Sequence, residues 1–422
     1  MKEIIFFTIL ILCLLNLLRM AAYLVSSDAY TIRQSLQKRR RSRWHLPTIS
    51  VLVPAHNEEN TIERNLLSLY GSDYPKGKLE VIVVNDGSTD RTEEVVREFK
   101  RTHRDRCKIR LINLSNKGKA AALNHGLRRC AKGSLVMCLD SDSFLAPNAL
   151  RSAAQHFRDS DIVALSSNVN IIEDGTLLAL VQRFEYLVCY QMKKGQAFLG
   201  VEYIVGGIGS MFRRSMMKKV SFYDTNTMTE DIDLTMKIIV NKEKRQKIAY
   251  AADSIAYTEP AHSVGALMQQ RFRWKFGRSQ TFYKNDHLFF SRSSRHAKRL
   301  TWFMLPFSLL QDLFFFFEPA VIGYFLFLTM RYGDLRIFSS AMFVLTFYLL
   351  CNVWSSDHLT TKERLRLSYY TPPMYLLMYV LSWAEYFALI KSLLLLPSLK
   401  RSITERHVTW RSPERKRATA SA

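Results

Sequence analysis

The sequence predicts an α/β domain with a mainly parallel sheet, attached to transmembrane helices. Two observations support this fold class. Between residues 46 and 260, short apolar runs alternate with segments whose apolar residues recur every three or four positions, a pattern typical of parallel strands separated by helices. Before and after this region lie apolar runs of about 20 residues or more, the length needed to cross a bilayer.

Composition excludes several protein classes. The chain has 422 residues, 48% of them apolar, and its 60 Lys and Arg against 37 Asp and Glu give a formal net charge of +23. Collagen-like, low-complexity and disordered chains do not combine so much charge with so much apolar sequence. Six cysteines without a C-x-x-C pair exclude a disulfide scaffold and a thiolate zinc site. Reduced thiols facing the cytosol fit better.

The first element is an N-terminal transmembrane helix, predicted within residues 1–27. Residues 4–25 are apolar except for Asn16 and Arg19. A cleaved signal peptide is the alternative, but the apolar stretch is long for one and lacks a small-x-small cleavage site. The linker 28–47 that follows contains the basic run 38–43. Beside a span, such charge marks the cytosolic side of the membrane, near anionic headgroups.

The middle region, 48–260, is predicted to be one catalytic domain. Its expected strands are 49–55, 79–85, 108–114, 134–140 and 162–167. Its expected helices are 58–70, 90–102, 117–131 and 147–158. Ligands of such sheets bind beyond the carboxyl ends of the strands, so the residues that follow each strand are the candidate site.

Polar residues follow four of these strands. They are Asn57 and Glu58 after the first strand, Asp86 after the second, Lys119 after the third, and Asp140 with Asp142 after the fourth. Carboxylates suit a nucleotide base or ribose, lysine offsets phosphate charge, and a D-x-D pair can hold one hard cation whose shell a diphosphate completes. The sequence thus predicts a nucleotide–metal site at this edge of the sheet.

Each cluster taken alone also has a structural interpretation. The D-G-S-T-D segment at 86–90 is a favourable turn and helix start. Lys117 and Lys119 could be solvent-exposed lysines at the start of a helix, with no ligand. The order of all four clusters along the chain favours a site. No G-x-x-x-x-G-K-[ST] or G-x-G-x-x-G motif occurs, so the sequence contains neither the motif of a P-loop nor that of a Rossmann dinucleotide site.

Two further motifs follow the strands. Glu230 and Asp231 precede a helix-like run, and an Asp there could act as a general base, although acids also suit any helix start. The region 261–298 begins with an amphipathic helix, 262–278, predicted to lie at the membrane surface. It contains Q-R-F-R-W, residues 270–274. An arginine there could bind a diphosphate and a tryptophan could stack on a sugar.

The C-terminal part, 299–398, is predicted to form about three transmembrane helices. The apolar runs are 300–330, 336–354 and 372–397. Asp312 and Glu318 interrupt the first, and such acids usually face a protein interior or a water-filled path. One span before the catalytic domain and three after it would place the basic tail 399–422 outside, against its charge. Either one run does not cross, or the charge rule fails for the tail.

The motifs together resemble the family 2 processive membrane glycosyltransferases. They are HNEE (56–59), VNDGSTD (84–90), NKGKAAALN (116–124), DSD (140–142), TED (229–231) and QRFRW (270–274). Within that family the chain is most similar to bacterial poly-β-1,6-N-acetylglucosamine synthases of biofilm polysaccharide systems, which GGIGSMFRR (206–214) and TWRSPERKR (409–417) support. The resemblance implies a GT-A domain in the cytoplasm, in a multi-pass protein of the bacterial cell membrane.

The resemblance also implies an activity. The expected reaction is inverting polymerisation of N-acetylglucosamine from UDP-N-acetylglucosamine into a β-linked, β-1,6 exopolysaccharide. Another UDP-sugar, transfer of a single sugar to a lipid carrier, and a non-enzymatic basic membrane-surface protein are the alternatives. The expected partners are the growing polysaccharide, the bilayer, a small membrane subunit and export or deacetylase proteins, with no nucleic acid. The chain departs from the longer synthases of that family in having one N-terminal span and only three C-terminal apolar runs.

Site roles follow from the same resemblance. The uridine pocket would be lined by Asn57, Glu58 and Asp86, with Lys119 near the nucleotide and Asp140 supporting it. Asp142 would bind Mg²⁺ or Mn²⁺ on the diphosphate. Asp231 would be the base and Glu230 would lie beside the acceptor. The diphosphate and the acceptor end would be held by Gln270, Arg273 and Trp274.

Overall fold

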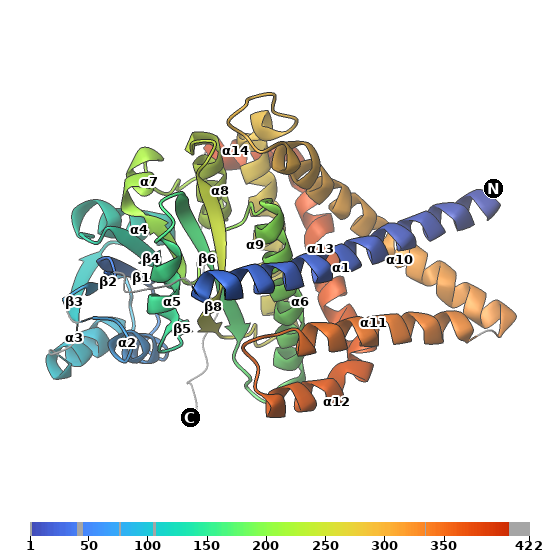
Figure 1. Ribbon diagram of the computed structural model, residues 1–422, viewed down its shortest axis with the longest axis horizontal. Coiled ribbons are helices and arrows are strands. Elements are labelled where there is room, and N and C mark those ends of the chain that lie inside the picture. Colours follow the sequence, from blue (N-terminus) through green and yellow to red (C-terminus); the bar gives the residue numbers. More distant parts are fainter. Residues whose placement is uncertain (1, 40–44, 76, 104–106, 334, 405–422) are drawn as a thin grey trace.

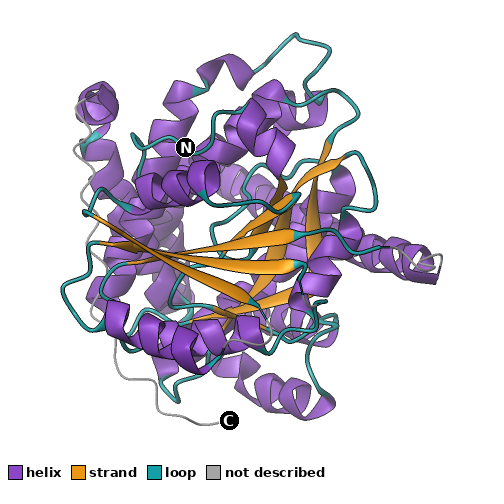
Figure 2. Ribbon diagram, turned by 90° about the vertical axis from the view of Figure 1, so that its left-hand side faces the viewer, coloured by secondary structure: helices purple, strands orange, loops and turns teal. Residues whose placement is uncertain are grey.

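The computed structural model describes residues 2–39, 45–75, 77–103, 107–333 and 335–404. Its centre is an eight-stranded sheet with the order β3-β2-β1-β4-β7-β6-β8-β5. The strands are β1 (Ile49–Ala55), β2 (Leu79–Asp86), β3 (Lys108–Leu114), β4 (Leu135–Cys138), β5 (Phe144–Leu145), β6 (Ile162–Ile171), β7 (Ser210–Arg213) and β8 (Lys247–Thr258). Helices lie on both sides of this sheet (Figure 2).

The prediction of a mainly parallel sheet is confirmed. Strands β3, β2, β1 and β4 pair in parallel, as do β6 and β8. Two short strands, β5 and β7, pair antiparallel with their neighbours, so the sheet is mixed. The five predicted strands correspond to β1, β2, β3, β4 and β6, whereas β5, β7 and β8 were not predicted.

The helices between the strands also match the prediction. They are α2 (Ile62–Tyr70), α3 (Thr92–Thr102), α4 (Lys119–Arg129) and α5 (Ala149–His156). After β6 come α6 (Leu177–Leu199), α7 (Arg214–Lys219), α8 (Glu230–Asn241) and α9 (Val264–Lys284). The predicted amphipathic helix 262–278 is the first part of α9, which continues for almost two further turns.

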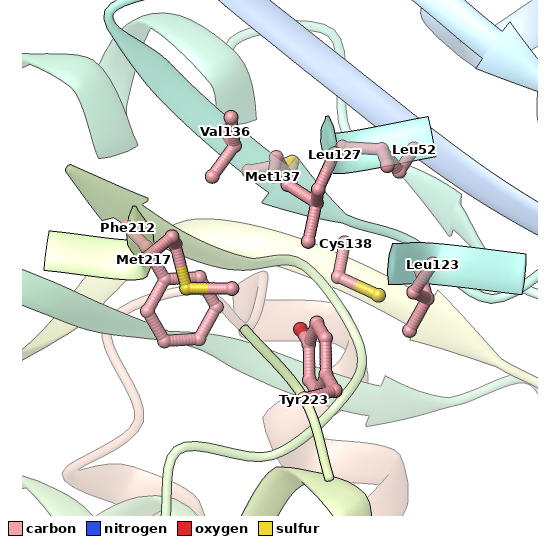
Figure 3. Close-up of a pocket in the computed structure, with 9 residues that line it drawn as sticks. All are labelled: Leu52, Leu123, Leu127, Val136, Met137, Cys138, Phe212, Met217 and Tyr223. Atoms are coloured by element: carbon pink, nitrogen blue, oxygen red, sulfur yellow. The ribbon is translucent and has the colours of Figure 1, made fainter. Parts of the chain in front are cut away.

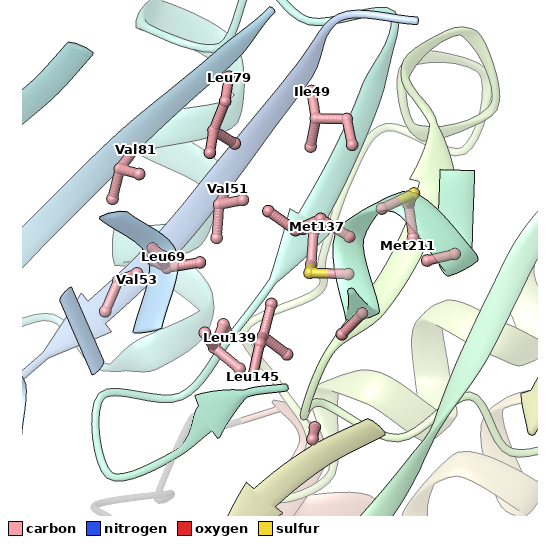
Figure 4. Packing of buried hydrophobic residues seen from close by; sticks show 14 of the residues in the cluster. Ile49, Val51, Val53, Leu69, Leu79, Val81, Met137, Leu139, Leu145 and Met211 are labelled. Atoms are coloured by element: carbon pink, nitrogen blue, oxygen red, sulfur yellow. The ribbon is translucent and has the colours of Figure 1, made fainter. Parts of the chain in front are cut away.

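Two hydrophobic cores, one on each face, hold the sheet in place. Alternate residues of a strand point to opposite faces. Val51 and Val53 of β1 therefore enter one core with Leu69 of α2 (Figure 4), while Leu52 enters the other with Leu123 of α4. All five side chains are almost completely buried, and each such burial contributes about 1.5–3 kcal/mol. The strand ends, and with them the candidate site, rest on this rigid support.

The N-terminal helix α1 (Lys2–Arg39) packs along α6. Gly195 of α6 permits the close approach, because a Cβ there would lie 3.1 Å from the carbonyl oxygen of Tyr23. Near its end, the Tyr30 hydroxyl donates to the backbone oxygen of Tyr250 in β8, at 2.6 Å. The helix is continuous to Arg39, so residues 28–39 of the expected linker are helical. The basic residues 40–43 lie outside the described part, as do the side chains of much of 4–16.

The C-terminal helices extend away from the sheet beside α1 (Figure 1). A π-helical turn, Arg299–Met304, leads into α10 (Leu305–Tyr332), which is followed by α11 (Arg336–Trp354), α12 (Thr361–Leu377), α13 (Tyr379–Leu394) and α14 (Leu399–Thr404). Residues Arg299–Tyr332 form one 34-residue helix whose most apolar stretch is not buried by the protein. Within the described residues, this helix is long and apolar enough to cross a membrane.

A second candidate span is bent. Helices α12 and α13 pass the same test only together, and their axes differ by 43°. The run predicted over 372–397 is therefore not one straight helix. Pro372 and Pro373 lie within two turns of the bend, and proline removes a backbone donor and crowds the preceding turn. The apolar part of α11 is shorter, Phe338–Trp354. Crossing in several passes stays a prediction, and most of the basic tail lies outside the described residues.

Candidate active site

The loops after β1 and β2 are fastened to each other. The parallel register places Ala55 beside Asn85, so both loops begin at the same edge. Asn57 has a positive φ of 56°, which turns its side chain toward the second loop. Its Oδ1 accepts from the backbone N–H of Thr89 at 2.8 Å, and its own N–H donates to Ser88 Oγ at 3.0 Å.

Glu58 lies deeper, at the start of α2. Its side chain is buried and accepts from the Thr61 hydroxyl at 2.6 Å. Its backbone N–H donates to Thr92 Oγ1 at 2.8 Å. Both contacts organise the loop, so its predicted place in a uridine pocket stays a prediction.

Asp86, at the end of β2, binds the loop that follows β3. Its two carboxylate oxygens accept from the backbone N–H groups of Lys117 at 2.9 Å and Gly118 at 2.8 Å. The neighbouring Gly87 has a φ of +69°, and a Cβ there would lie 2.7 Å from the backbone nitrogen of Asn116. The turn therefore requires glycine, and Asp86 brings the third loop to the same edge.

Lys119 links this edge to a second group of acids. Its Nζ lies 2.7 Å from Asp140 Oδ1, just beyond β4, and 3.0 Å from Glu230 Oε1, at the start of α8. Burial alone would lower the pKa of Lys119, but the two carboxylates outweigh it and hold the pKa well above its ordinary value. Lys119 is therefore a permanent cation between two acids that lie far apart in the sequence.

Gly207 lies between three of the candidate residues, Lys119, Asp140 and Asp231. A Cβ placed on it would lie 3.1 Å from Lys119 Nζ, 3.8 Å from Asp231 Oδ2 and 3.9 Å from Asp140 Oδ2. A side chain here would fill the space between these groups. Gly207 belongs to the segment 206–214, in which sequence reasoning saw only a family likeness. Two successive glycines just before a strand were the available signal.

Asp231 has the electrostatics of a base. Burial is the main cause that raises its pKa, and the neighbouring Glu230 adds to it, while Lys119 and Arg273 lower it, with a result of about 6. The carboxylate is therefore mostly ionised at neutral pH and accepts a proton more readily than an ordinary Asp. Proton acceptance of this kind is what general-base catalysis requires.

Helix α9 lies directly against the start of α8. A Cβ on Gly277 would be 2.7 Å from the Thr229 side chain, and Gln280 Oε1 accepts from the backbone N–H of Met228 at 2.9 Å. This contact brings Arg273 close enough to act on Asp231. By helical spacing, Gln270 and Trp274 share the face of α9 that carries Arg273.

Asp142 lies two residues beyond Asp140 and is partly buried. Its Oδ1 accepts from Ser143 Oγ at 2.9 Å. Within the described residues, no group of three or more His, Cys, Asp or Glu side chains is arranged to hold a metal ion. A cation at Asp142 would therefore need oxygen ligands from a bound substrate, which a diphosphate offers. The residues fit a metal held jointly with the donor.

A small cavity elsewhere does not fit a charged ligand. It lies within the hydrophobic core on one face of the sheet, and its lining is apolar except for the Cys138 thiol and the Tyr223 hydroxyl (Figure 3). Burial raises the pKa of the Cys138 thiol well above its ordinary value. The cavity is part of the core, and the candidate site is the strand-end edge.

Residues 50–221 match the family model described as glycosyl transferase family 2. The chain contains a family 2 glycosyltransferase domain. Curated relatives named poly-β-1,6-N-acetyl-D-glucosamine synthase agree. One from Staphylococcus epidermidis is 29% identical over 262 residues, 61% of this chain and 60% of the relative. One from Staphylococcus aureus strain MSSA476 is 29% identical over 282 residues, 65% of this chain and 64% of the relative. The chain thus matches less than two thirds of these relatives' length.

The fold of one solved structure is similar to that of this chain over the glycosyltransferase domain and beyond it. A mannosyltransferase from Pyrobaculum calidifontis, determined with GDP-mannose and Mn²⁺, superposes with a TM-score of 0.56 at 20% identity, over 89% of this chain and 98% of that one. The glycosyltransferase domain therefore has a GT-A-like fold with a mixed sheet.

The predicted site residues of the glycosyltransferase form two joined groups. One is the loop group of Asn57, Glu58 and Asp86. The other is the ionic group of Lys119, Asp140, Glu230, Asp231 and Arg273. Residues 117–119 join them, because Asp86 binds the backbone of 117 and 118 while Lys119 reaches Asp140 and Glu230. The roles predicted for individual residues, including Gln270, Trp274 and Asp142, stay predictions.

Proposed function

We propose that this protein is a membrane-embedded inverting glycosyltransferase that polymerises N-acetylglucosamine from UDP-N-acetylglucosamine into a β-1,6-linked exopolysaccharide. The observation that supports the transfer chemistry is the meeting of Lys119, Asp140 and Asp231 around Gly207 at the sheet edge. The names of the curated relatives support the sugar and the linkage.

Asp231 is the proposed general base. An acceptor hydroxyl loses its proton to the Asp231 carboxylate and attacks the anomeric carbon of the donor. The bond from that carbon to the diphosphate breaks on the opposite face, and UDP departs with the electron pair. The configuration at the anomeric carbon is inverted. The pKa of about 6 for Asp231 keeps it ready to accept the proton at neutral pH, which is worth about 10²–10⁴-fold in rate.

Positive charge near Asp231 supports the leaving group. Arg273 acts on Asp231 from α9 and is proposed to contact the diphosphate as its negative charge grows. A Mg²⁺ or Mn²⁺ ion held by Asp142 would supply further electrostatic stabilisation of that charge when bound. The mannosyltransferase of like fold was solved with Mn²⁺ and a nucleotide sugar. Asn57, Glu58 and Asp86 are proposed to line the base and ribose pocket.

The proposed location is the bacterial cell membrane, with the glycosyltransferase domain in the cytoplasm. The long apolar helix Arg299–Tyr332 supports membrane insertion. The proposed partners are the growing polysaccharide, the bilayer, a small membrane subunit and export or deacetylase proteins.

Incorporation of labelled sugar by purified membranes tests the proposal. The donors are UDP-N-acetylglucosamine, UDP-glucose, UDP-glucuronic acid and GDP-mannose, each supplied alone with Mg²⁺ or Mn²⁺. We expect long products from UDP-N-acetylglucosamine only, with β-1,6 linkage. Long products from another donor would correct the sugar, and a product one sugar longer than a lipid acceptor would favour the single-transfer alternative. No incorporation from any donor would contradict the proposal.

A further inference from the structure

Helix α9 has two faces with different partners. Residues three, four and seven positions apart share a face of a helix. The face toward α8, here called the site face, carries Gln270, Arg273, Trp274 and Gly277. The neighbouring face, here called the cationic face, carries Arg271, Lys275 and Arg278. The sequence predicted a helix at the membrane surface, where such cations would meet headgroups. In the structure these cations pair with carboxylates, and the place of the helix at the membrane surface stays a prediction.

Two of these carboxylates belong to the apolar C-terminal helices. Lys275 Nζ lies 3.1 Å from Asp312 Oδ1 of α10 and 3.3 Å from Glu385 Oε2 of α13. Arg278 also pairs with Asp312. One turn of α9 is thereby joined to both helices, although they are separate in the sequence.

The third cation acts on the site face itself. Arg271 Nη2 lies 2.6 Å from Glu185 Oε2 of α6, and its Nη1 lies 3.9 Å from Glu385 Oε1. The same guanidinium lies 4.4 Å from the centre of the Trp274 ring. A cation over an aromatic face is an attractive contact. Glu385 and Glu185 therefore hold Arg271, and Arg271 in turn orients the indole of Trp274.

This network is shielded from solvent. The side chain of Arg271 is 3% exposed, and those of Lys275 and Asp312 are 16% and 21% exposed. Salt screens such pairs less than surface pairs. When one partner of a buried pair is removed, the other charge is left without compensation, which is strongly unfavourable. Neutralising one carboxylate should therefore displace α9.

We propose that Asp312 and Glu385 are positioning residues for glycosyl transfer. They hold the cationic face of α9, and this fixes Arg273 and Trp274 on the site face relative to Asp231. The inference rests on the proposed function for its effect on rate, but the anchoring of α9 can be measured without activity. The apolar helices then contribute to the geometry of the catalytic site and not only to membrane attachment.

Three matched variants test the proposal in the full chain, reconstituted in lipid nanodiscs. Asp312→Asn and Glu385→Gln remove one negative charge each with little change of shape. Glu318→Gln is the control, because Glu318 also interrupts α10 and forms no ion pair among the residues that the structure describes. Asp312→Glu is the conservative variant that keeps the charge.

The first readout is hydrogen–deuterium exchange. We expect Asp312→Asn and Glu385→Gln to speed exchange across residues 264–284 at least tenfold, with β1 to β3 unchanged. We expect Glu318→Gln to leave α9 as in the parent protein, and Asp312→Glu to restore part of the protection. Unchanged exchange of α9 in both charge-removing variants would overturn the inference, whether or not the protein transfers sugar.

The second readout separates donor binding from transfer. A misplaced catalytic group costs up to about 10²-fold in rate, so we expect the kcat for transfer to fall about 10- to 100-fold in Asp312→Asn and Glu385→Gln. The dissociation constant for the donor nucleotide should change much less than kcat, because the loops after β1 and β2, which are proposed to bind the base and ribose, are held by hydrogen bonds that involve no residue of α9. Equal losses of kcat and nucleotide affinity, or the same loss in Glu318→Gln, would overturn the positioning role.

Failure of the proposed function looks different. If the parent protein turns over no nucleotide sugar while exchange in α9 responds to Asp312→Asn, the anchoring stands and the activity is wrong. Should Asp312→Asn fail to fold, the double variant Asp312→Asn with Arg278→Met removes both charges of the Asp312–Arg278 pair and leaves Lys275 paired with Glu385. Faster exchange of α9 in this double variant supports the inference, and parent-like exchange contradicts it.

Discussion

At the scale of single residues, the raised pKa of Asp231 bears directly on the proposed chemistry. Its pKa of about 6 results from burial and from Glu230, opposed by Lys119 and Arg273. Below that pH the carboxyl is protonated and cannot accept a proton from the acceptor. Above it the carboxylate is ionised and the base is available.

The pH dependence of transfer should follow this ionisation. We expect kcat/KM to rise about tenfold per pH unit up to about pH 6 and then level off. Lys119 lowers the pKa of Asp231, so Lys119→Met should move the acid limb to higher pH. A limb that stays in place in this variant would show that another group controls it.

Metal dependence belongs to the residue scale as well. Because no cluster of three or more ligating side chains is present among the described residues, the ion should bind weakly without donor. We expect a chelator to abolish transfer, and Mg²⁺ or Mn²⁺ to restore it. Asp142→Ala should raise the metal concentration needed at least tenfold, while Asp286→Ala, at an exposed site, should not. An unchanged requirement in Asp142→Ala would argue against Asp142 as a ligand.

At the scale of elements, the contact between α8 and α9 decides whether the site forms. Gly277 leaves no room for a side chain, since a Cβ would lie 2.7 Å from the Thr229 side chain and 3.0 Å from its backbone nitrogen. Even a methyl group must therefore push the two helices apart.

Gly277→Ala tests this contact. Overpacking of this kind costs about 1–3 kcal/mol, so we expect a small loss in thermal stability together with a loss in kcat of about 10²-fold. Thr229→Ala in the same chain should restore part of the activity, because it removes Oγ1 and Cγ2, the two atoms at 2.7 Å, while the backbone nitrogen at 3.0 Å remains. Gly323→Ala, where a Cβ meets nothing within 4 Å, is the control. Full activity of Gly277→Ala would contradict the account.

The same elements show what the sequence can and cannot predict. Strands β1, β2 and β4 and the first part of β6 are largely apolar, and β3 mixes apolar with polar residues. The rule that ligands bind beyond the carboxyl ends of parallel strands selected the residues after each strand, and the structure joins Asp86, Lys119 and Asp140 at one edge. The strand β8 was missed because Asp253 and Ser254 interrupt its apolar run, near a register shift opposite Ser167 and Asn168. The strand β7 has only four residues, too few for an alternating pattern to be recognised.

The ionic group could be predicted only in part. Lys119, Asp140 and Glu230 were each identified in separate motifs, but their mutual ion pairs depend on how α8 packs against the sheet. No local pattern reports that. Gly207 and the partners of Arg271 were missed for the same reason, since a contact between residues 271 and 385 is a property of the folded chain.

At the scale of the whole molecule, ion pairs from α9 to α10 and α13 connect the glycosyltransferase domain to the apolar helices. Helix α10 exposes many large apolar side chains, among them Leu313, Phe317 and Phe327. Exposed apolar surface on this scale is stable only in contact with lipid or another protein. We therefore expect the protein to associate firmly with membranes.

Extraction distinguishes insertion from surface binding. We expect the protein to stay in the membrane fraction after washes with 1 M salt or alkaline carbonate, and to dissolve only in detergent, because apolar contact with lipid is not weakened by ionic screening. A protein held only by its net charge of +23 would be released by salt. Release in either wash would contradict membrane insertion.

Asp231 is the proposed base of a glycosyl transfer at the strand-end edge. The most direct test compares Asp231→Asn with the parent protein in nanodiscs, measuring UDP binding by calorimetry and labelled sugar transfer in the same preparation. The account predicts a loss of transfer of at least about 10²-fold with the UDP dissociation constant changed by less than about threefold. Transfer at the parent rate, or loss of UDP binding in step with activity, would contradict it.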